Sequence, residues 1–137
     1  MRRCRDEDRV ANPAEQVALA RWAGWGSIPQ VFDDTDDRFA AERAHIRQLL
    51  GTEEAWSQAR RTTLNAHYTS ASVVTAMWSA VRDLGVDGPA RVLEPGCGSG
   101  NFLGFAPPDA VLTGVELDAT TAAIARHLYG ARATIHN

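Results

Sequence analysis

The sequence contains no lysine, only two cysteines and no long apolar run. Its 14 basic residues are all arginine and are outnumbered by 17 acidic residues, so the net charge is −3. This balance argues against a strongly basic nucleic-acid surface spread over the chain. No apolar stretch approaches the roughly 18 residues of a membrane span, and the N-terminus lacks the apolar core of a signal peptide. We therefore expect no membrane segment.

The shortage of cysteine limits metal and disulfide chemistry. Cys4 and Cys97 cannot form a metal site by themselves, so we expect no metal. Cys97 lies inside a glycine-rich turn, where a disulfide would be awkward, which favours a reduced, cytoplasmic setting. With 137 residues, 45% of them hydrophobic and 23% charged, the chain is at most one domain's worth of globular protein.

The most informative stretch is RVLEPGCGSGNFLGF, residues 91–105. It begins as a short apolar strand that ends on Glu94, and a turn with alternating glycines follows. These glycines are Gly96, Gly98 and Gly100. Glycine suits such a turn because it adopts positive φ and lets a ligand approach the backbone closely. The alternative is an ordinary tight turn with no ligand.

A helix and a second strand follow the turn. Asn101 and Phe102 open the helix, whose free N–H groups point back at the glycines. The second strand, VLTGVEL, ends on Glu116 and Leu117. Strand, glycine turn, helix, strand and acid form the layout of a nucleotide-binding βαβ half. The glycines read E-x-G-x-G-x-G rather than G-x-G-x-x-G, which argues against a nicotinamide-dependent oxidoreductase.

This stretch resembles the S-adenosylmethionine-dependent methyltransferases. In that family the glycine loop holds the methionyl and ribose part of the cofactor, and an acid at the end of the second strand binds both ribose hydroxyls. Glu116 stands at the position of that acid, and a carboxylate suits two hydroxyl donors. The resemblance implies S-adenosylmethionine as the cofactor and a set of binding residues around the turn: Glu94, Gly96, Gly98, Gly100, Asn101, Phe102, Glu116 and Leu117.

A second element of the resemblance is HYTSASVV, residues 67–74, ahead of the glycine turn. It resembles the segment of adenine-specific DNA methyltransferases that reaches over to the cofactor, which implies that Tyr68 and Thr69 contact S-adenosylmethionine. The proline often found after the threonine is Ser70 here. The alternative for Tyr68 and Thr69 is a plain turn at a helix start. A lone histidine such as His67 is more often structural than catalytic.

The order of these elements resembles adenine-N6 DNA methyltransferases that place the target-recognition region last, which implies DNA as a partner. Those enzymes carry a catalytic Asn/Asp-Pro-Pro-Tyr/Phe loop after a later strand, where it binds the amine of a flipped-out adenine. The sequence contains no such motif, and Pro107-Pro108 follows Ala106 between the first two strands. We therefore assign no catalytic residue and expect no turnover. The alternative is a non-catalytic remnant that at most binds the cofactor.

The expected fold is α/β, a Rossmann-like methyltransferase fold with an incomplete parallel sheet preceded by a helical N-terminal segment. A sheet of about three strands leaves one edge unpaired and one face uncovered. The expected segments are a flexible tail at 1–12, a helical segment at 13–63 and the start of the cofactor-binding domain at 64–137. Helices are predicted from Pro13, over 37–50, 53–63 and 71–84, and after Asp118.

The helical segment carries the remaining hypotheses. LARWAGWGSIPQVFDD, residues 19–34, loosely resembles segments ahead of the methylase region in very large mobile-element proteins, which implies a fused or separate helicase partner. Trp22, Trp25 and Phe32 are predicted to pin a loop by core packing, the alternative being a platform for a base or a partner. Arg43 and Arg47 are predicted to form a solvated face. A helical interaction module on a nucleotide-binding scaffold is the competing hypothesis.

Overall fold

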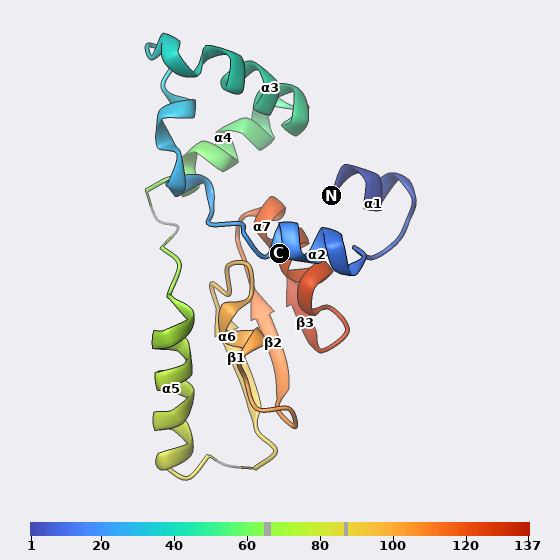
Figure 1. Cartoon of the computed structure of the whole chain (residues 1–137), viewed down its shortest axis with the longest axis vertical. Coiled ribbons are helices and arrows are strands. Elements are labelled where there is room, and N and C mark those ends of the chain that lie inside the picture. The colour runs from blue at the N-terminus through green and yellow to red at the C-terminus, as the bar shows by residue number, and fades with distance from the viewer. Residues whose placement is uncertain (65–66, 87) are drawn as a thin grey trace. The chain divides into compact units, whose positions relative to one another are not determined.

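The computed structural model describes residues 1–64, 67–86 and 88–137. The chain forms two compact units, residues 1–22 with 68–137 and residues 23–67. The first, the sheet unit, contains the strands of the described residues, and the second, the helical unit, contains helices (Figure 1). The predicted start of the cofactor-binding domain, residue 64, adjoins residues 65 and 66, which lie outside the described residues.

Parallel strands form the sheet in the order β1, β2, β3 (Figure 1). They are β1 (Arg91–Pro95), β2 (Val111–Val115) and β3 (Ala133–His136). In register, Val92 pairs with Leu112, and Leu112 pairs with Ala133. The prediction of an α/β chain with a short parallel sheet is confirmed, and the arrangement is compatible with part of a Rossmann-like fold.

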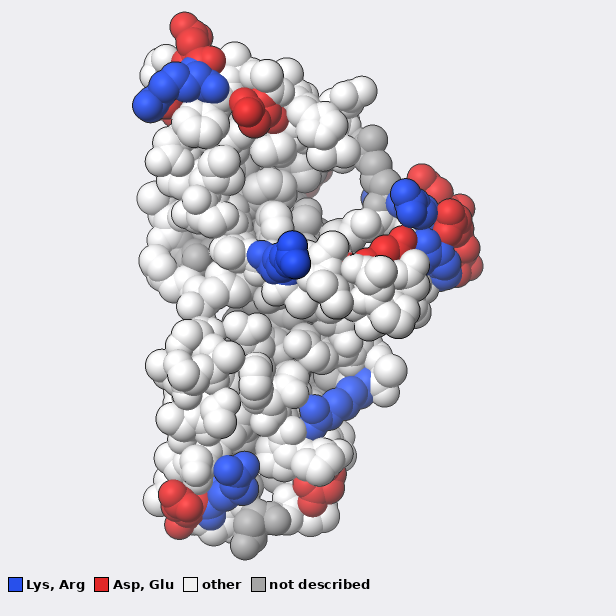
Figure 2. Space-filling model, in the orientation of Figure 1, with Lys and Arg blue, Asp and Glu red and all other residues white. Residues whose placement is uncertain are grey.

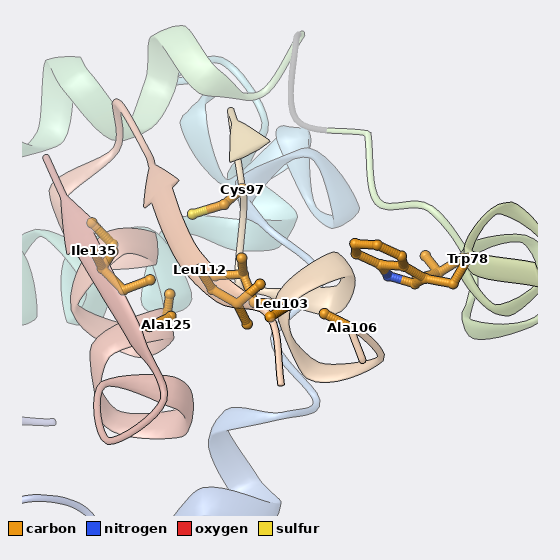
Figure 3. Close-up of a cluster of buried hydrophobic side chains, with 11 residues drawn as sticks. Trp78, Cys97, Leu103, Ala106, Leu112, Ala125 and Ile135 are labelled. Carbon is orange, nitrogen blue, oxygen red and sulfur yellow. The ribbon is translucent and has the colours of Figure 1, made fainter. Parts of the chain in front are cut away.

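One face of the sheet carries the core, because side chains alternate between the two faces of a strand. Helices on that side supply the covering side chains: α5 (Ala71–Asp83), α6 (Asn101–Gly104) and α7 (Ala119–Tyr129). Figure 3 shows members of this cluster: Leu103 from α6 lies beside Leu112, Ala125 from α7 lies near Ile135, and Trp78 from α5 lies on the side of Ala106. Leu103 is 1% exposed and Ala125 is fully buried, so this cluster holds the helices on the sheet.

The opposite face of the sheet is uncovered in the part of the chain that the structure describes. Leu93 of β1 and Val111 of β2 are 62% and 63% exposed. Both lie on this face, because Val111 pairs with Arg91, two residues before Leu93 along β1. The uncovered face expected for a short parallel sheet is therefore present.

The connection from α6 to β2 is shaped by prolines and by an arginine. Pro107 and Pro108 follow α6 and cannot continue a helix. Arg132 donates to carbonyl oxygens at the end of α6, which lack intrahelical partners, and in the residues that follow it. Its Nη2 donates to the carbonyls of Ala106 and Pro107, each at 2.6 Å, and its Nη1 donates to the carbonyl of Leu103 at 3.3 Å. The predicted early end of this helix is confirmed.

The N-terminal residues 1–22 pack within the sheet unit. They form α1 (Arg2–Asp6) and α2 (Pro13–Leu19), and α2 begins with a capping box between Asn12 and Glu15. Within the tail expected at 1–12, Cys4 is 2% exposed. Arg9 reaches over the same region, with its Nη1 2.6 Å from a carboxylate oxygen of Glu15.

Three hydrogen bonds attach this segment to α7, one of them from Trp22 Nε1 to Thr121 Oγ1 at 3.0 Å. Gln16 Nε2 donates to the His127 carbonyl at 3.0 Å, and the Ala11 backbone N–H donates to His127 Nδ1 at 3.3 Å. The structure therefore groups residues 13–22 with the sheet rather than with the rest of the expected helical segment.

The helical unit is built around aromatic rings. Its elements are η1 (Trp25–Ser27), η2 (Pro29–Phe32), η3 (Asp37–Phe39), α3 (Ala40–Leu50) and α4 (Glu53–Thr62). The ring centroids of Trp25 and Phe32 lie 5.7 Å apart, and those of Phe32 and Trp56 lie 4.6 Å apart. The core packing predicted for Trp25 and Phe32 is confirmed, whereas Trp22 belongs to the sheet unit.

The solvated face predicted for Arg43 is wrong. Its side chain is 11% exposed because it closes the turn ahead of α3. Its guanidinium donates to the carbonyls of Val31 at 3.2 Å and Asp36 at 2.6 Å, and also to that of Asp33. Arg47 lies instead over the ring of Trp56, with 4.2 Å between the guanidinium carbon and the ring centroid.

The attachment of α2 to α7 should depend on pH through His127. Burial lowers the pKa of His127 below its usual 6.5, and its Nδ1 accepts a hydrogen bond that protonation would remove. The unfolded chain therefore binds more protons between the two pKa values. The contribution of this contact to the free energy of unfolding should be fully present above pH 6.5. It should be lost as the pH falls through the lower pKa of His127 in the folded protein. Urea unfolding at a series of pH values measures this.

His127→Asn is the matched variant, because an amide oxygen can accept from Ala11 but does not titrate. It should flatten this part of the pH profile. A profile that is unchanged in His127→Asn would contradict the assignment.

Candidate cofactor site

The glycine turn after β1 adopts the backbone conformation that its sequence predicts. Gly96, Gly98 and Gly100 have φ values of +95°, +56° and +99°, all in the left-handed region that favours glycine. The carbonyl of Val115 accepts hydrogen bonds from the N–H of Gly96 at 2.7 Å and of Cys97 at 2.8 Å. The turn is thereby folded back over the C-terminal end of β2.

The surroundings of the three glycines differ. A Cβ at Gly96 would meet nothing within 4 Å, so space is open beside the first glycine. A Cβ at Gly98 would lie 3.3 Å from the ring of Tyr68, and a Cβ at Gly100 would lie 2.5 Å from the ring of Tyr129. The second and third glycines are therefore packed against aromatic rings, and only the first leaves room for a ligand at the backbone.

Glu116 holds the turn from the end of β2. Its carboxylate accepts from the N–H of Gly98 at 3.0 Å through Oε2 and from the N–H of Asp118 at 2.7 Å through Oε1. Its own N–H donates to the His136 carbonyl at 2.9 Å. A carboxylate offers about four lone-pair sites. Glu116 can therefore hold the turn and still accept from two further donors.

Two other predicted residues flank this carboxylate at the ends of the strands. Glu94, in β1, is half-buried, and its carboxylate accepts no hydrogen bond from the residues that the structure describes. Burial raises the pKa of its carboxyl group. Leu117, directly after Glu116, is 89% exposed. In the sequence, the glycine turn thus lies between the Glu94 carboxylate, which has no described hydrogen-bond donor, and the exposed apolar side chain of Leu117.

The predicted Tyr68–Thr69 segment also lies against the turn. Asn101 Nδ2 donates to the Thr69 carbonyl at 3.0 Å, which ties the segment to the start of α6. The Tyr68 ring covers Gly98. Burial raises the pKa of the Tyr68 hydroxyl, against the effect of hydrogen bonds with Thr121 and Trp22.

The remaining predicted residue, Phe102, packs partly buried against the core, and its carbonyl accepts from Trp78 Nε1 at 3.0 Å. The sheet unit therefore contains every residue predicted for the site: Tyr68, Thr69, Glu94, Gly96, Gly98, Gly100, Asn101, Phe102, Glu116 and Leu117. His67 belongs to the helical unit and is exposed.

The sequence interpretation missed two residues behind the site, Trp22 and Thr121. Trp22 Nε1 donates to Thr121 Oγ1 at 3.0 Å, across 99 positions of the chain. Because Trp22, Trp25 and Phe32 are close in the sequence, the three rings were predicted to pack together. Thr121 had a weak signal, because it stands three residues after the predicted cap Asp118, and its N–H donates to that carboxylate at 2.8 Å.

The surroundings of Cys97 disfavour a role for its thiol as a nucleophile. Burial raises the pKa of its thiol to about 11, so the thiolate is scarce near neutral pH. The side chain packs against Gly114, where a Cβ would lie 2.8 Å from its sulfur. The described residues contain no group of three or more His, Cys, Asp or Glu side chains that could hold a metal.

The charged side chains do not form one basic surface on the face shown in Figure 2. Arginine side chains there occur as separate groups, several of them beside acidic side chains. Among the described residues, no helix is both long enough and apolar enough to cross a membrane.

Comparison with known proteins relates part of this chain to a methyltransferase. The chain is 41% identical over 70 residues to the Type II methyltransferase M.XamI of Xanthomonas campestris pv. amaranthicola. The match covers 49% of this chain and 13% of that protein. No family model and no solved structure matches the chain. The similarity supports a methyltransferase relationship for this segment.

The packing of the turn predicts unequal costs for two alanine substitutions. Gly96→Ala should cost about 1 to 2 kcal/mol of the free energy of unfolding, because only backbone strain is added. Gly100→Ala should cost about 3 kcal/mol or more, because the new methyl group also overlaps the Tyr129 ring. Urea unfolding of both variants measures the difference.

A double-mutant cycle with Tyr129→Ala provides the control. The Gly100 and Tyr129 losses should be sub-additive, since removal of the ring removes the overlap. Equal losses for Gly96→Ala and Gly100→Ala would contradict this packing.

Proposed function

We propose that this chain is the S-adenosylmethionine-binding N-terminal part of a DNA methyltransferase of the adenine-N6 type. One observation carries the proposal. The Glu116 carboxylate stands at the C-terminal end of β2, fixed by the N–H groups of Gly98 and Asp118, beside a glycine turn with open space at Gly96. Ligands of open parallel sheets bind at this edge, outside the carboxyl ends of the strands.

The residues present fit this cofactor. The two ribose hydroxyls are donors, and the Glu116 carboxylate has lone pairs left for both. The half-buried Glu94 carboxylate lacks a described donor, so it can accept from the ammonium group of the methionyl part. The methionyl chain of the cofactor would pass over the open backbone at Gly96, and exposed Leu117 would pack against the adenine ring.

S-adenosylmethionine, when bound, supplies an electrophilic methyl group. The contribution of this chain is to bind and orient it, which is the positioning part of methyl-transfer catalysis. The Tyr68 ring covers Gly98 on one side of the turn. None of these residues acts as a nucleophile, consistent with the raised pKa of Cys97.

DNA as the substrate is supported by two observations. M.XamI, to which part of the chain is similar, is a Type II methyltransferase, and the HYTSASVV segment resembles that of adenine-specific enzymes. The chain spans 13% of the length of M.XamI, so the activity of a complete enzyme is itself part of the proposal. An amine-binding Asn/Asp-Pro-Pro-Tyr/Phe motif is absent from the sequence, and we expect these 137 residues to bind the cofactor without turnover.

Calorimetric titration tests the cofactor. The chain should bind S-adenosylmethionine and not NADH. Glu116→Ala should weaken the binding of S-adenosylmethionine by about 2 kcal/mol, roughly 30-fold, because charge-assisted hydrogen bonds to the ribose are lost.

Asp109→Ala is the control, since Asp109 is an exposed acid of the same unit. It lowers the negative charge equally and should leave the affinity unchanged. Because Glu116 also holds the turn, thermal unfolding of each variant must show that it is folded at the titration temperature. Binding of NADH alone, or equal affinity of wild type and Glu116→Ala, would overturn the assignment.

A further inference from the structure

A hydrogen-bonded group of Trp22, Thr121 and Asp118 joins two separate parts of the chain. Trp22 Nε1 donates to Thr121 Oγ1 at 3.0 Å. Thr121 Oγ1 in turn donates to Asp118 Oδ2 at 2.7 Å, and the Thr121 N–H donates to the same oxygen at 2.8 Å. Asp118 and Thr121 are buried, at 6% and 4% exposure. The group therefore connects residue 22, in the N-terminal segment, with the start of α7.

The direction of each hydrogen bond in this group is set by its chemistry. An indole N–H can only donate, and an ionised carboxylate can only accept. The Thr121 hydroxyl stands between the two, so its single hydrogen points at Asp118 while its lone pair accepts from Trp22. Removal of the indole N–H leaves a nearly buried hydroxyl oxygen without that donor, which is costly away from water.

Two further contacts lead from this group to the proposed cofactor site. The Asp118 N–H donates to Glu116 Oε1 at 2.7 Å, so the position of Asp118 orients the carboxylate that faces the ribose in the proposed function. The Tyr68 hydroxyl interacts with both Trp22 and Thr121, and its ring packs against Gly98. Trp22 is thereby linked to both groups that hold the turn.

We propose that Trp22 is a positioning residue for the cofactor site, acting through Thr121 and Asp118 on Glu116 and through Tyr68 on Gly98. The proposal rests on the function proposed above. This proposal goes beyond that function because it assigns a role in the cofactor site to a residue of the N-terminal segment. That residue is remote in sequence from the glycine turn.

The same segment offers a matched control at Gln16. Gln16 also attaches residues 13–22 to α7, through its hydrogen bond to the His127 carbonyl at 3.0 Å. Among the described residues, its side chain forms no hydrogen bond with Thr121, Asp118 or Tyr68. Gln16→Ala therefore weakens the docking of the segment without removing the hydrogen bond that reaches the site.

The first measurement is calorimetric titration of the full chain with S-adenosylhomocysteine. Trp22→Phe keeps an aromatic ring but removes the N–H donor, and it should weaken binding about fivefold. Thr121→Val should weaken binding similarly, and Thr121→Ser, which keeps the hydroxyl, should retain wild-type affinity. Gln16→Ala should bind as tightly as wild type. Trp22→Phe and Thr121→Val should be strongly non-additive, because they remove the same hydrogen bond.

The second measurement needs no ligand. In ¹⁵N–¹H spectra of the free protein, the amide resonances of Gly98 and Asp118 should move in Trp22→Phe and Thr121→Val but not in Gln16→Ala. If Trp22→Phe does not fold, the spectra of Thr121→Val and Thr121→Ser are compared instead, because only Thr121→Val removes the hydroxyl that accepts from Trp22.

The outcomes separate the two proposals. Wild-type protein that does not bind S-adenosylhomocysteine overturns the proposed function, and the ligand-free spectra still decide the role of Trp22. If the wild-type protein binds S-adenosylhomocysteine, and Trp22→Phe and Gln16→Ala lose affinity equally, then Trp22 only anchors the N-terminal segment. That result overturns the positioning role. Unmoved Gly98 and Asp118 resonances in Trp22→Phe overturn it as well.

Discussion

The sheet unit depends on the two backbone hydrogen bonds accepted by the Glu116 carboxylate. One comes from Gly98 in the turn after β1 and the other from Asp118 at the start of α7, so one side chain joins the ends of neighbouring strands. The turn needs this restraint because its three left-handed glycines lose much conformational freedom on folding. Hydrogen bonds to a charged acceptor are worth more than neutral ones, about 1.5–3 kcal/mol each. The same carboxylate is the group that we propose for the ribose, so stability and cofactor binding share one residue.

The core beneath this edge explains how a small sheet can hold the turn steady. Leu103 is nearly fully buried against β2, and Arg132 fixes the chain between α6 and β2 through carbonyl oxygens. The other face of the sheet leaves Leu93 and Val111 exposed, so the packing that supports the site comes from one side. The relationship to M.XamI covers 13% of that protein, and the function proposed for this segment is accordingly cofactor binding rather than complete methyl transfer.

The sequence predicted what depends on local signals and missed what depends on distant contacts. The glycine spacing, Pro107-Pro108 and the Asp118 cap are local, and the turn, the short α6 and the start of α7 follow them. The roles of the predicted site residues toward a cofactor stay predictions. Arg43 was misassigned because helical spacing identifies a face of the helix but not the loop whose carbonyls return over it. Trp22 was missed because its partner, Thr121, is 99 positions away.

The most direct test of the central claim is a crystal structure of the chain with S-adenosylhomocysteine. The account predicts both ribose hydroxyls within hydrogen-bonding distance of the Glu116 carboxylate, with the Gly98 and Asp118 hydrogen bonds retained. It also predicts that the homocysteine part passes over Gly96, the one glycine of the turn with open space. A nucleoside bound elsewhere, or a Glu116 carboxylate that contacts no part of the ligand, would contradict the account.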